Sequence, residues 1–159
     1  MKQCELPYVR ARMNTLINQP LHDAGYAADM LTLSFGLEGE FCLHVQCSYR
    51  MATEDVILFD RIDYFIEDEP DNRLFNAVRK LREHLDGMTV TAIEVSQLGD
   101  LRICFANGVT LLALPMSSDA DDECWRFWHD DLWPDQHMVV YGDHVELHGP
   151  GKEESRFHE

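Results

Sequence analysis

Hydrophobic and polar side chains alternate along several segments of the chain, and this alternation predicts strands. From residue 41 to 51 the odd-numbered positions are apolar or aromatic, whereas the even-numbered positions are Cys42, His44, Gln46, Ser48 and Arg50. A period of two puts the two sets on opposite faces of a strand, so we predict one half-buried strand over 41–51. Apolar or β-branched runs predict further strands at 30–35, 56–59, 62–66, 89–95, 101–105, 109–114, 125–128, 138–141 and 144–147.

Helical spacing of apolar residues occurs in two places. The stronger case is residues 73–85, where charged side chains face outward and one apolar stripe faces a core; the stripe consists of Leu74, Phe75, Val78, Leu81 and Leu85. Asp71 or Asn72 is a suitable N-cap, and Gly87 suits the turn after the helix. A shorter N-terminal helix is predicted from Leu6 towards Ile17, because Pro20 stops any continuation.

Strands on both sides of one amphipathic helix predict an α+β fold in a single domain, residues 1–148. It would consist of two antiparallel β-meanders joined by the helix, with the short helix at the N-terminus. The Asn107-Gly108 pair predicts a type I′ hairpin between two of the strands, because both central positions of that turn need positive φ. Residues 149–159 contain few apolar side chains and are expected to form a flexible C-terminal tail.

The two β-rich segments share an order of features that suggests an internal repeat. Each contains a strand that ends in a phenylalanine, Phe35 or Phe105. Each later contains a cysteine followed closely by an aromatic–Arg pair, at 47–50 and at 124–126. Chance similarity is the alternative, because β-meanders share a pattern of alternation by necessity.

Charge is the unusual feature of the composition. Among 159 residues there are 13 Lys and Arg and 29 Asp and Glu, which gives a formal net charge of −16. Such a field repels nucleic acids and anionic membranes, so neither is expected as a partner. It favours encounter with basic proteins, basic peptides or cations. A second interpretation is that the acidic surface only maintains solubility.

The five cysteines follow no metal-binding or disulfide-framework spacing. They are Cys4, Cys42, Cys47, Cys104 and Cys124, and no Cys-x-x-Cys pair occurs. An odd number without such spacing argues against a disulfide scaffold and against a zinc knuckle. The sequence shows no secretory signal and no apolar run long enough to span a bilayer. We therefore expect a cytoplasmic protein that carries no cofactor and no metal.

One candidate ligand-binding face comes from the predicted strand 41–51. Its polar side would present His44, Gln46, Ser48 and Arg50, and Arg126 of the second half could face it. An Arg beside a large aromatic residue can form a fork to a carboxylate, so this face could bind an anionic ligand. The alternative is that Arg50 and Arg126 each tie a strand to its neighbour.

A second candidate surface combines carboxylates with tryptophans in the C-terminal third. It consists of Asp119, Asp121, Asp122, Glu123, Asp130, Asp131 and Trp133. Exposed indoles among carboxylates would suit a basic protein partner, because aromatic anchors dominate interface energy and charge sets the encounter rate. The alternative is a solvated loop beside core tryptophans. The loop lacks the ligand order of an EF-hand, and the chain carries no recognisable catalytic motif.

The order of these motifs resembles that of a family of small bacterial proteins of uncharacterised activity. Their first motif reads approximately Phe-Gly…Leu-His-Val-Gln-Cys-x-Trp-Arg, which residues 35–36 and 43–50 match with Tyr49 in place of Trp. Residues 99–108, 125–127 and 137–140 resemble the second half of the same proteins, although Trp128 and Trp133 extend that motif, so the likeness covers about 13 to 147. Some similar acidic proteins resemble immunity proteins that neutralise secreted bacterial toxins. The resemblance implies a binding role but no particular site.

Three functions are compatible with the sequence. The first is a non-catalytic protein-binding module of the immunity type, which neutralises a basic partner by charge complementarity. The second is a protein that binds a small anion or other small ligand, or an unrecognised enzyme, and uses the polar face around His44 and Arg50. The third is a structural subunit of a homo-oligomer, since sheets can pair edge to edge.

Overall fold

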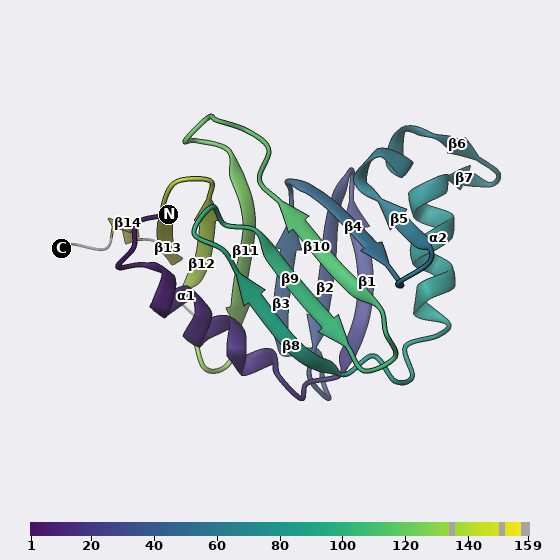
Figure 1. Ribbon diagram of the computed structural model, residues 1–159, viewed down its shortest axis with the longest axis horizontal. Coiled ribbons are helices and arrows are strands. Elements are labelled where there is room, and N and C mark those ends of the chain that lie inside the picture. The colour runs from purple at the N-terminus through teal and green to yellow at the C-terminus, as the bar shows by residue number, and fades with distance from the viewer. Residues whose placement is uncertain (134–135, 150–151, 157–159) are drawn as a thin grey trace.

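Two antiparallel sheets pack face to face, and a helix lies at each side of the pair (Figure 1). The computed structural model describes residues 1–133, 136–149 and 152–156. In chain order the elements are α1 (Leu6–Met13), the 3-10 helix η1 (Asn14–Leu16), β1 (Leu21–Ala27), β2 (Met30–Phe35), β3 (Phe41–Val45), β4 (Ser48–Ala52), β5 (Ile57–Asp60), the 3-10 helix η2 (Arg61–Phe65), β6 (Glu67–Asp68), β7 (Asp71–Asn72), α2 (Arg73–Arg82), β8 (Val90–Val95), β9 (Leu101–Phe105), β10 (Thr110–Leu114), β11 (Glu123–His129), β12 (His137–Tyr141), β13 (Val145–Gly149) and β14 (Lys152–Arg156).

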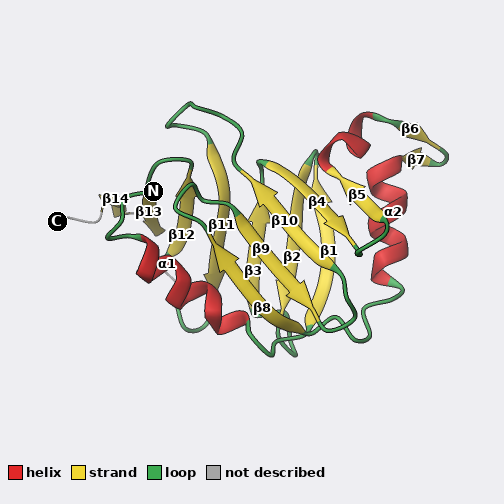
Figure 2. Cartoon of the chain, in the orientation of Figure 1, coloured by secondary structure: helices red, strands yellow, loops and turns green. Residues whose placement is uncertain are grey.

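The larger sheet has seven strands in the order β1-β2-β3-β11-β12-β13-β14, and the smaller has five in the order β5-β4-β10-β9-β8. Figure 2 shows the five-stranded sheet lying across the seven-stranded one, with the helices outside both. All recorded strand pairs within these two sheets are antiparallel. The predicted α+β class, with antiparallel sheets and a short N-terminal helix, is confirmed.

The core lies between the sheets and takes alternate residues from each. On the seven-stranded side Phe35 and Leu43 are fully buried, and on the five-stranded side Ile103 and Leu111 are fully buried. Trp125 is also fully buried, and its indole N–H donates to the backbone oxygen of Gly99 at 2.8 Å. The period-two alternation gives each sheet one apolar face, and the two apolar faces therefore meet in one shared layer.

Helix α2 begins as the sequence predicts. The side-chain oxygen of Asn72 accepts a hydrogen bond from the Phe75 backbone N–H at 2.8 Å, so Asn72 is the N-cap. Leu74 and Val78 are buried, and each contributes roughly 1.5–3 kcal/mol by leaving water. The helix ends at Arg82, three residues before the predicted end, and covers the side of the molecule next to β1 and β5.

Helix α1 covers the opposite side, beside β8 (Figure 1). Its Arg10 side chain donates two hydrogen bonds to the backbone oxygen of Val95, at 2.9 and 3.1 Å, and so fixes the helix to the end of that strand. Met13 is fully buried and joins the core. The chain then tightens into η1 before Pro20, which agrees with the predicted stop.

The strand predicted over 41–51 is two strands in different sheets, which corrects the prediction. β3 belongs to the seven-stranded sheet, whereas β4 belongs to the five-stranded sheet. The backbone N–H groups of Gln46 and Cys47 both donate to the carbonyl oxygen of Cys124, at 2.9 and 3.0 Å, and the chain crosses between sheets at this point. Alternation survives the crossing, because Val45 and Tyr49 are both buried.

Three further local predictions differ from the structure. Residues 62–66 lie mostly in the 3-10 helix η2 rather than in a strand, because the Asp60 side chain accepts from the Ile62 and Asp63 backbone N–H groups and caps it. Residues 23–25, where the sequence pattern predicted no strand, belong to strand β1. The hairpin at 107–108 forms, but only Gly108 has positive φ, at 86°, so its turn is not type I′.

The segment expected to be a flexible tail, 149–159, falls partly outside the described residues. Within it, β14 pairs antiparallel with β13, and Gly149 lies opposite Lys152 in the register.

Candidate functional site

The outer face of the five-stranded sheet carries a hollow of about 480 Å³ beside β4. Tyr49 and Met51 point into the core, so Ser48 and Arg50 point outward from the same strand. Arg50 lies opposite Asp60 of β5 and Leu112 of β10 in the register. The alternation of β4 therefore places the Arg50 side chain in the wall of this hollow.

Apolar side chains form most of the remaining wall of this hollow, which we call the apolar hollow. They come from β5, η2 and β10 and are Ile57, Ile62, Phe65, Leu112 and Leu114. Ile62 is 67% exposed and Phe65 is 68% exposed. The Asp60 cap fixes the start of η2, and the side chains of Ile62 and Phe65 in this helix are exposed to solvent. Exposed apolar groups that gather in one patch are typical of binding sites.

A second hollow of about 620 Å³ lies where the chain crosses from β3 to β4. We call it the acidic hollow, because Asp121, Asp122 and Glu123 line it. Ser48 and Arg61 line both hollows, so the two lie side by side and share one wall; together we call them the groove.

The charges inside the groove are divided unevenly. Arg61 is paired with Asp29, with Nη2 and Nε at 2.6 and 2.8 Å from Oδ2, so its charge is neutralised. Asp121 and Asp122 are exposed and take part in no ion pair recorded among the described residues. The acidic end of the groove therefore carries uncompensated negative charge that would attract a cation.

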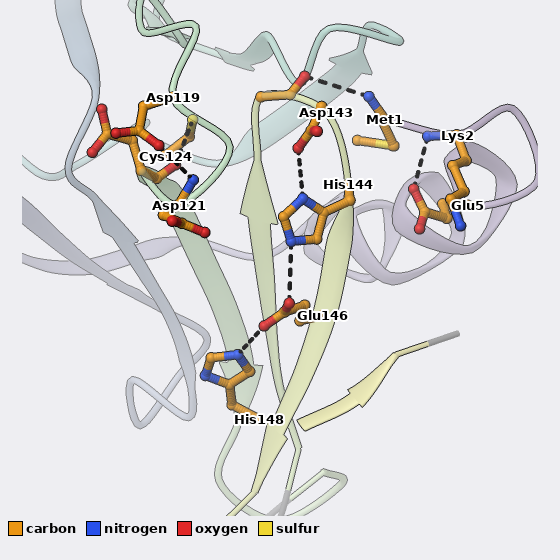
Figure 3. A network of polar contacts seen from close by, with 12 residues as sticks. Met1, Lys2, Glu5, Asp119, Asp121, Cys124, Asp143, His144, Glu146 and His148 are labelled. Carbon is orange, nitrogen blue, oxygen red and sulfur yellow. Dashed lines mark hydrogen bonds and ion pairs between the residues drawn. The ribbon is translucent and has the colours of Figure 1, made fainter. Parts of the chain in front are cut away.

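The loop that supplies these carboxylates is held by its own side chains. The backbone N–H of Asp121 donates to the Asp119 carboxylate at 3.0 Å, and Figure 3 shows the two residues beside Cys124. Glu123 is not available to a partner, because it holds Arg126 through two contacts of 2.5 and 2.6 Å. The hydrogen bonds that Arg126 donates to Glu123 raise the pKa of Arg126.

The structure does not bring the predicted ligand face together, and this corrects the prediction. His44 and Arg126 are neighbours in the register of β3 and β11, on the outer face of the seven-stranded sheet. Ser48 and Arg50 lie on the outer face of the other sheet, and Gln46 lies at the crossover. The physical reason is that each strand turns its polar side away from the shared core, so the change of sheet separates the polar residues.

The predicted acidic and aromatic surface is divided between the two ends of β11. Asp119, Asp121 and Asp122 precede this strand, and Asp130 and Asp131 follow it. The seven residues of β11 separate the two groups by about 23 Å. They do not form one continuous patch.

Trp133 is half-buried rather than a projecting anchor. The Arg12 guanidinium lies 4.1 Å from its ring centroid, and Phe127 and His129 approach the ring edge-on. This matches the core interpretation of that tryptophan better than the interface interpretation.

The outer face of the seven-stranded sheet holds a chain of histidines and carboxylates. Glu146 is buried, and its oxygens lie 3.1 Å from His144 Nε2 and 2.8 Å from His148 Nε2 (Figure 3). Asp143 contacts the other ring nitrogen of His144 at 2.5 Å. Burial raises the pKa of Glu146, but hydrogen bonds from the two histidines outweigh burial and leave this pKa below its ordinary value.

Two further histidines of this face lie against Trp128. The His137 ring stacks on the indole at 4.3 Å with 6° between the planes, and His44 meets its edge at 4.7 Å. Burial, followed by the nearby charge of Arg126, lowers the pKa of both His44 and His137. The rings are therefore held neutral and pack as aromatic groups.

Within residues 1–133, 136–149 and 152–156, no group of three or more His, Cys, Asp or Glu side chains is placed to hold a metal ion. Among the helices of the same residues, none is long and apolar enough to cross a membrane.

No protein-family model matches this chain, and no curated protein or solved structure matches it either. The resemblance to small bacterial proteins and to immunity proteins accordingly stays a prediction. Function is therefore inferred from the geometry of the groove.

Sequence reasoning missed the apolar hollow. Residues 56–59 and 62–66 were predicted as strands, which would bury the side chains that the structure exposes. A usable signal was present, because Asp60 and Asp63 have the spacing of a capping box and each accepts from the backbone of the other.

Proposed function

We propose that this protein is a non-catalytic protein-binding module whose groove receives an apolar side chain flanked by basic residues of a partner protein. The observation that carries the proposal is the shared wall at Ser48 and Arg61, which joins an apolar hollow to an acidic one. A basic partner with an adjacent apolar residue would complement both halves at once.

The two hollows would contribute differently to binding: the apolar hollow mainly to affinity, and the acidic hollow mainly to the association rate. An apolar anchor that enters the hollow between Ile62 and Phe65 would bury area on both molecules, and buried anchors carry most of the binding energy of an interface. Lys or Arg beside the anchor would meet Asp121 and Asp122 near the rim, where charge raises the association rate more than the affinity. The net charge of −16 adds long-range attraction for a basic protein.

An immunity-type role is the form of this proposal that agrees with the resemblance in the sequence. The protein would act in the cytoplasm and neutralise a basic toxin or nuclease by covering its charged surface.

The test is affinity capture from the source cells with paired variants. Wild-type protein and Leu37→Ser are expected to retain the same basic protein in stoichiometric amount, whereas Phe65→Ser is expected to lose it. Leu37 is the matched control, because it is 84% exposed in the turn between β2 and β3 and lies outside the groove. The captured protein is then purified and titrated directly against each variant. Equal binding by Phe65→Ser and wild type would exclude the groove as the binding site.

We also propose that the two halves are copies of one unit. Each half has a helix, then three consecutive strands in one sheet, then a crossing into the other sheet: α1, β1 to β3 and β4; α2, β8 to β10 and β11. The pairings are reciprocal, because β3 pairs with β11 and β10 pairs with β4. This correspondence supports a duplication over chance similarity between meanders.

The comparison of the halves favours a second candidate function at Arg50. In the strand pairings of the two halves, Tyr49 of β4 occupies the position that corresponds to Trp125 of β11. Arg50 likewise corresponds to Arg126. Arg126 is paired with Glu123, three residues before it, whereas Cys47 occupies the same place before Arg50. Arg50 is exposed and takes part in no ion pair recorded within the described ranges. It could therefore bind the carboxylate of a small ligand whose apolar part fills the hollow.

Thermal unfolding with added hexanoate tests the second candidate. A rise in midpoint that is lost in Arg50→Gln and kept in Arg102→Gln would support it, since Arg102 is exposed on the same face but lies outside the apolar hollow. The third function, a homo-oligomer, is tested by light scattering at high concentration, where a monomer would exclude it.

A further inference from the structure

Two cysteines that are far apart in the sequence meet at the crossover between the sheets. Cys47 lies between β3 and β4, and Cys124 lies in β11. The Cys47 backbone N–H donates to the Cys124 carbonyl oxygen at 3.0 Å, and each of the two thiols shifts the pKa of the other. Both residues line the acidic hollow.

This contact brings the residues within the range of a disulfide bond. An N–Cα bond of about 1.46 Å and a Cα–O separation of about 2.4 Å extend the 3.0 Å hydrogen bond, so the Cα atoms are at most about 7 Å apart. A disulfide usually joins Cα atoms at roughly 4.4–6.8 Å. Little backbone movement would be needed to join Cys47 to Cys124.

We propose that Cys47 and Cys124 form a reversible intramolecular disulfide when the protein meets a hydroperoxide. The Cys124 thiolate attacks one peroxide oxygen, the O–O bond breaks, and the released hydroxide takes up the proton of that thiol to become water. The Cys47 sulfur then attacks the sulfur of this sulfenic acid, the S–O bond breaks, and the leaving hydroxide takes the proton of the Cys47 thiol to become the second water. The two thiols are oxidised by two electrons, and hydrogen peroxide is reduced to two water molecules.

The surroundings support Cys124 as the attacking sulfur. The neighbouring Cys47 thiol lowers the pKa of Cys124, whereas the neighbouring Cys124 thiol, together with burial, raises the pKa of Cys47. A thiolate is the reactive form, and a neighbouring thiol is what resolves a sulfenic acid into a disulfide. Cys42 differs, because burial raises its pKa to about 11. Both cysteines line the acidic hollow, where Cys47 is half-buried and Cys124 is buried.

The disulfide would connect the crossover to the first residues of β11, next to Asp121 and Asp122. These two segments of the groove wall would then be joined by a covalent bond. The inference does not depend on the proposed function, because it concerns only the two thiols and the oxidant.

Peptide mapping after peroxide treatment tests the inference on the wild-type protein. The protein is exposed to hydrogen peroxide, free thiols are blocked with iodoacetamide, and the digest is analysed by mass spectrometry. The expected product is one cross-linked peptide pair that contains Cys47 and Cys124 and is separated by dithiothreitol, with Cys4, Cys42 and Cys104 alkylated. Alkylation of both Cys47 and Cys124, or overoxidation of Cys124 with alkylated Cys47, would overturn the proposal.

Single variants assign the two roles. In Cys47→Ser, dimedone is expected to label Cys124 after peroxide, because its sulfenic acid can no longer be resolved. In Cys124→Ser, Cys47 is expected to remain unlabelled. Cys104→Ser is the matched control and should keep the cross-link. Labelling of Cys47 in Cys124→Ser, without labelling of Cys124 in Cys47→Ser, would contradict the assignment.

Discussion

Phe35 and Phe105 stack on each other across the core, with ring centroids 6.3 Å apart and 6° between the planes. Phe35 is the last residue of β2, and Phe105 is the last residue of β9. Phe35 pairs with Leu21 and Phe105 with Val90, and in both pairs the register shifts immediately afterwards. The stack therefore joins corresponding positions of the two halves, which supports the proposed duplication.

Truncation of either ring should destabilise the fold strongly. Phe35→Ala and Phe105→Ala are each expected to cost about 3–5 kcal/mol, because each leaves a cavity in a close-packed core. Urea unfolding followed by tryptophan fluorescence measures the loss. Phe65→Ala is the control and should change stability by less than about 0.5 kcal/mol, since its ring is already exposed.

A double-mutant cycle tests whether the two rings stabilise each other. The double variant should lose about 0.5–1.5 kcal/mol less than the two single losses added together, since the contact can be removed only once. Simple additivity would show that each ring packs only against its own half.

The ion pair of Glu123 and Arg126 should contribute more than an exposed pair of the same type. Their side chains are only 15% and 27% exposed, whereas those of Glu94 and Arg102 are 74% and 52% exposed. Glu123→Gln leaves a half-buried guanidinium without its carboxylate and should cost about 1–3 kcal/mol. The matched change Glu94→Gln should cost less than about 1 kcal/mol. Equal losses in urea unfolding would contradict the assignment.

Stability should fall in two stages as the pH falls. His44 and His137 have pKa values below the ordinary 6.5 in the folded protein, so the unfolded chain binds more protons than the folded one once the pH falls below about that value. Asp143 and Glu146 have pKa values below their ordinary 3.8 and 4.5, so their contribution is present above those values and is lost as the pH falls through the lower, folded-state values. Both effects have the same sign, and proton linkage gives the slope.

Urea midpoints measured between pH 8 and pH 3 check this behaviour. His137→Gln should flatten the decline around pH 6, and Glu146→Gln should flatten the decline below pH 4.5. Both variants lose stability at neutral pH as well, so the slope is the readout. An unchanged slope in His137→Gln would show that this ring is not held neutral by the fold.

Local chemistry explains what could be predicted from the sequence. The start of α2 depends on Asn72, three residues before the Phe75 N–H that it caps, and on the spacing of Leu74 and Val78. The strands at 101–105 and 110–114 likewise depend on alternation within each segment and on the turn between them. Each of these signals lies within a few residues of the element that it specifies.

Distant contacts explain what could not be predicted. The chain changes sheets at Gln46 and Cys47 because of the Cys124 carbonyl, more than seventy residues away in the sequence, and the alternation of buried residues continues through the change. The carboxylates Asp121 and Asp122 and the guanidinium of Arg50 were identified from the sequence, but their place beside one groove depends on this crossing.

The acidic end of the groove gives a prediction that is independent of its apolar end. If Asp121 and Asp122 steer a basic partner, the association rate should fall as salt rises, because screening at 0.15 M already limits such attraction to about 8 Å. Asp121→Asn combined with Asp122→Asn should slow association several-fold and weaken its salt dependence, while dissociation changes little. Stopped-flow mixing with the captured partner measures both rates.

The matched control replaces two exposed carboxylates outside the groove, Glu83 and Glu94, by amides. It removes the same net charge and should slow association much less, because steering depends on charge near the docking surface. Equal slowing in both double variants would mean that only the total charge of the protein acts on the partner. The acidic hollow would then have no role in recognition, and the apolar hollow alone would have to explain binding.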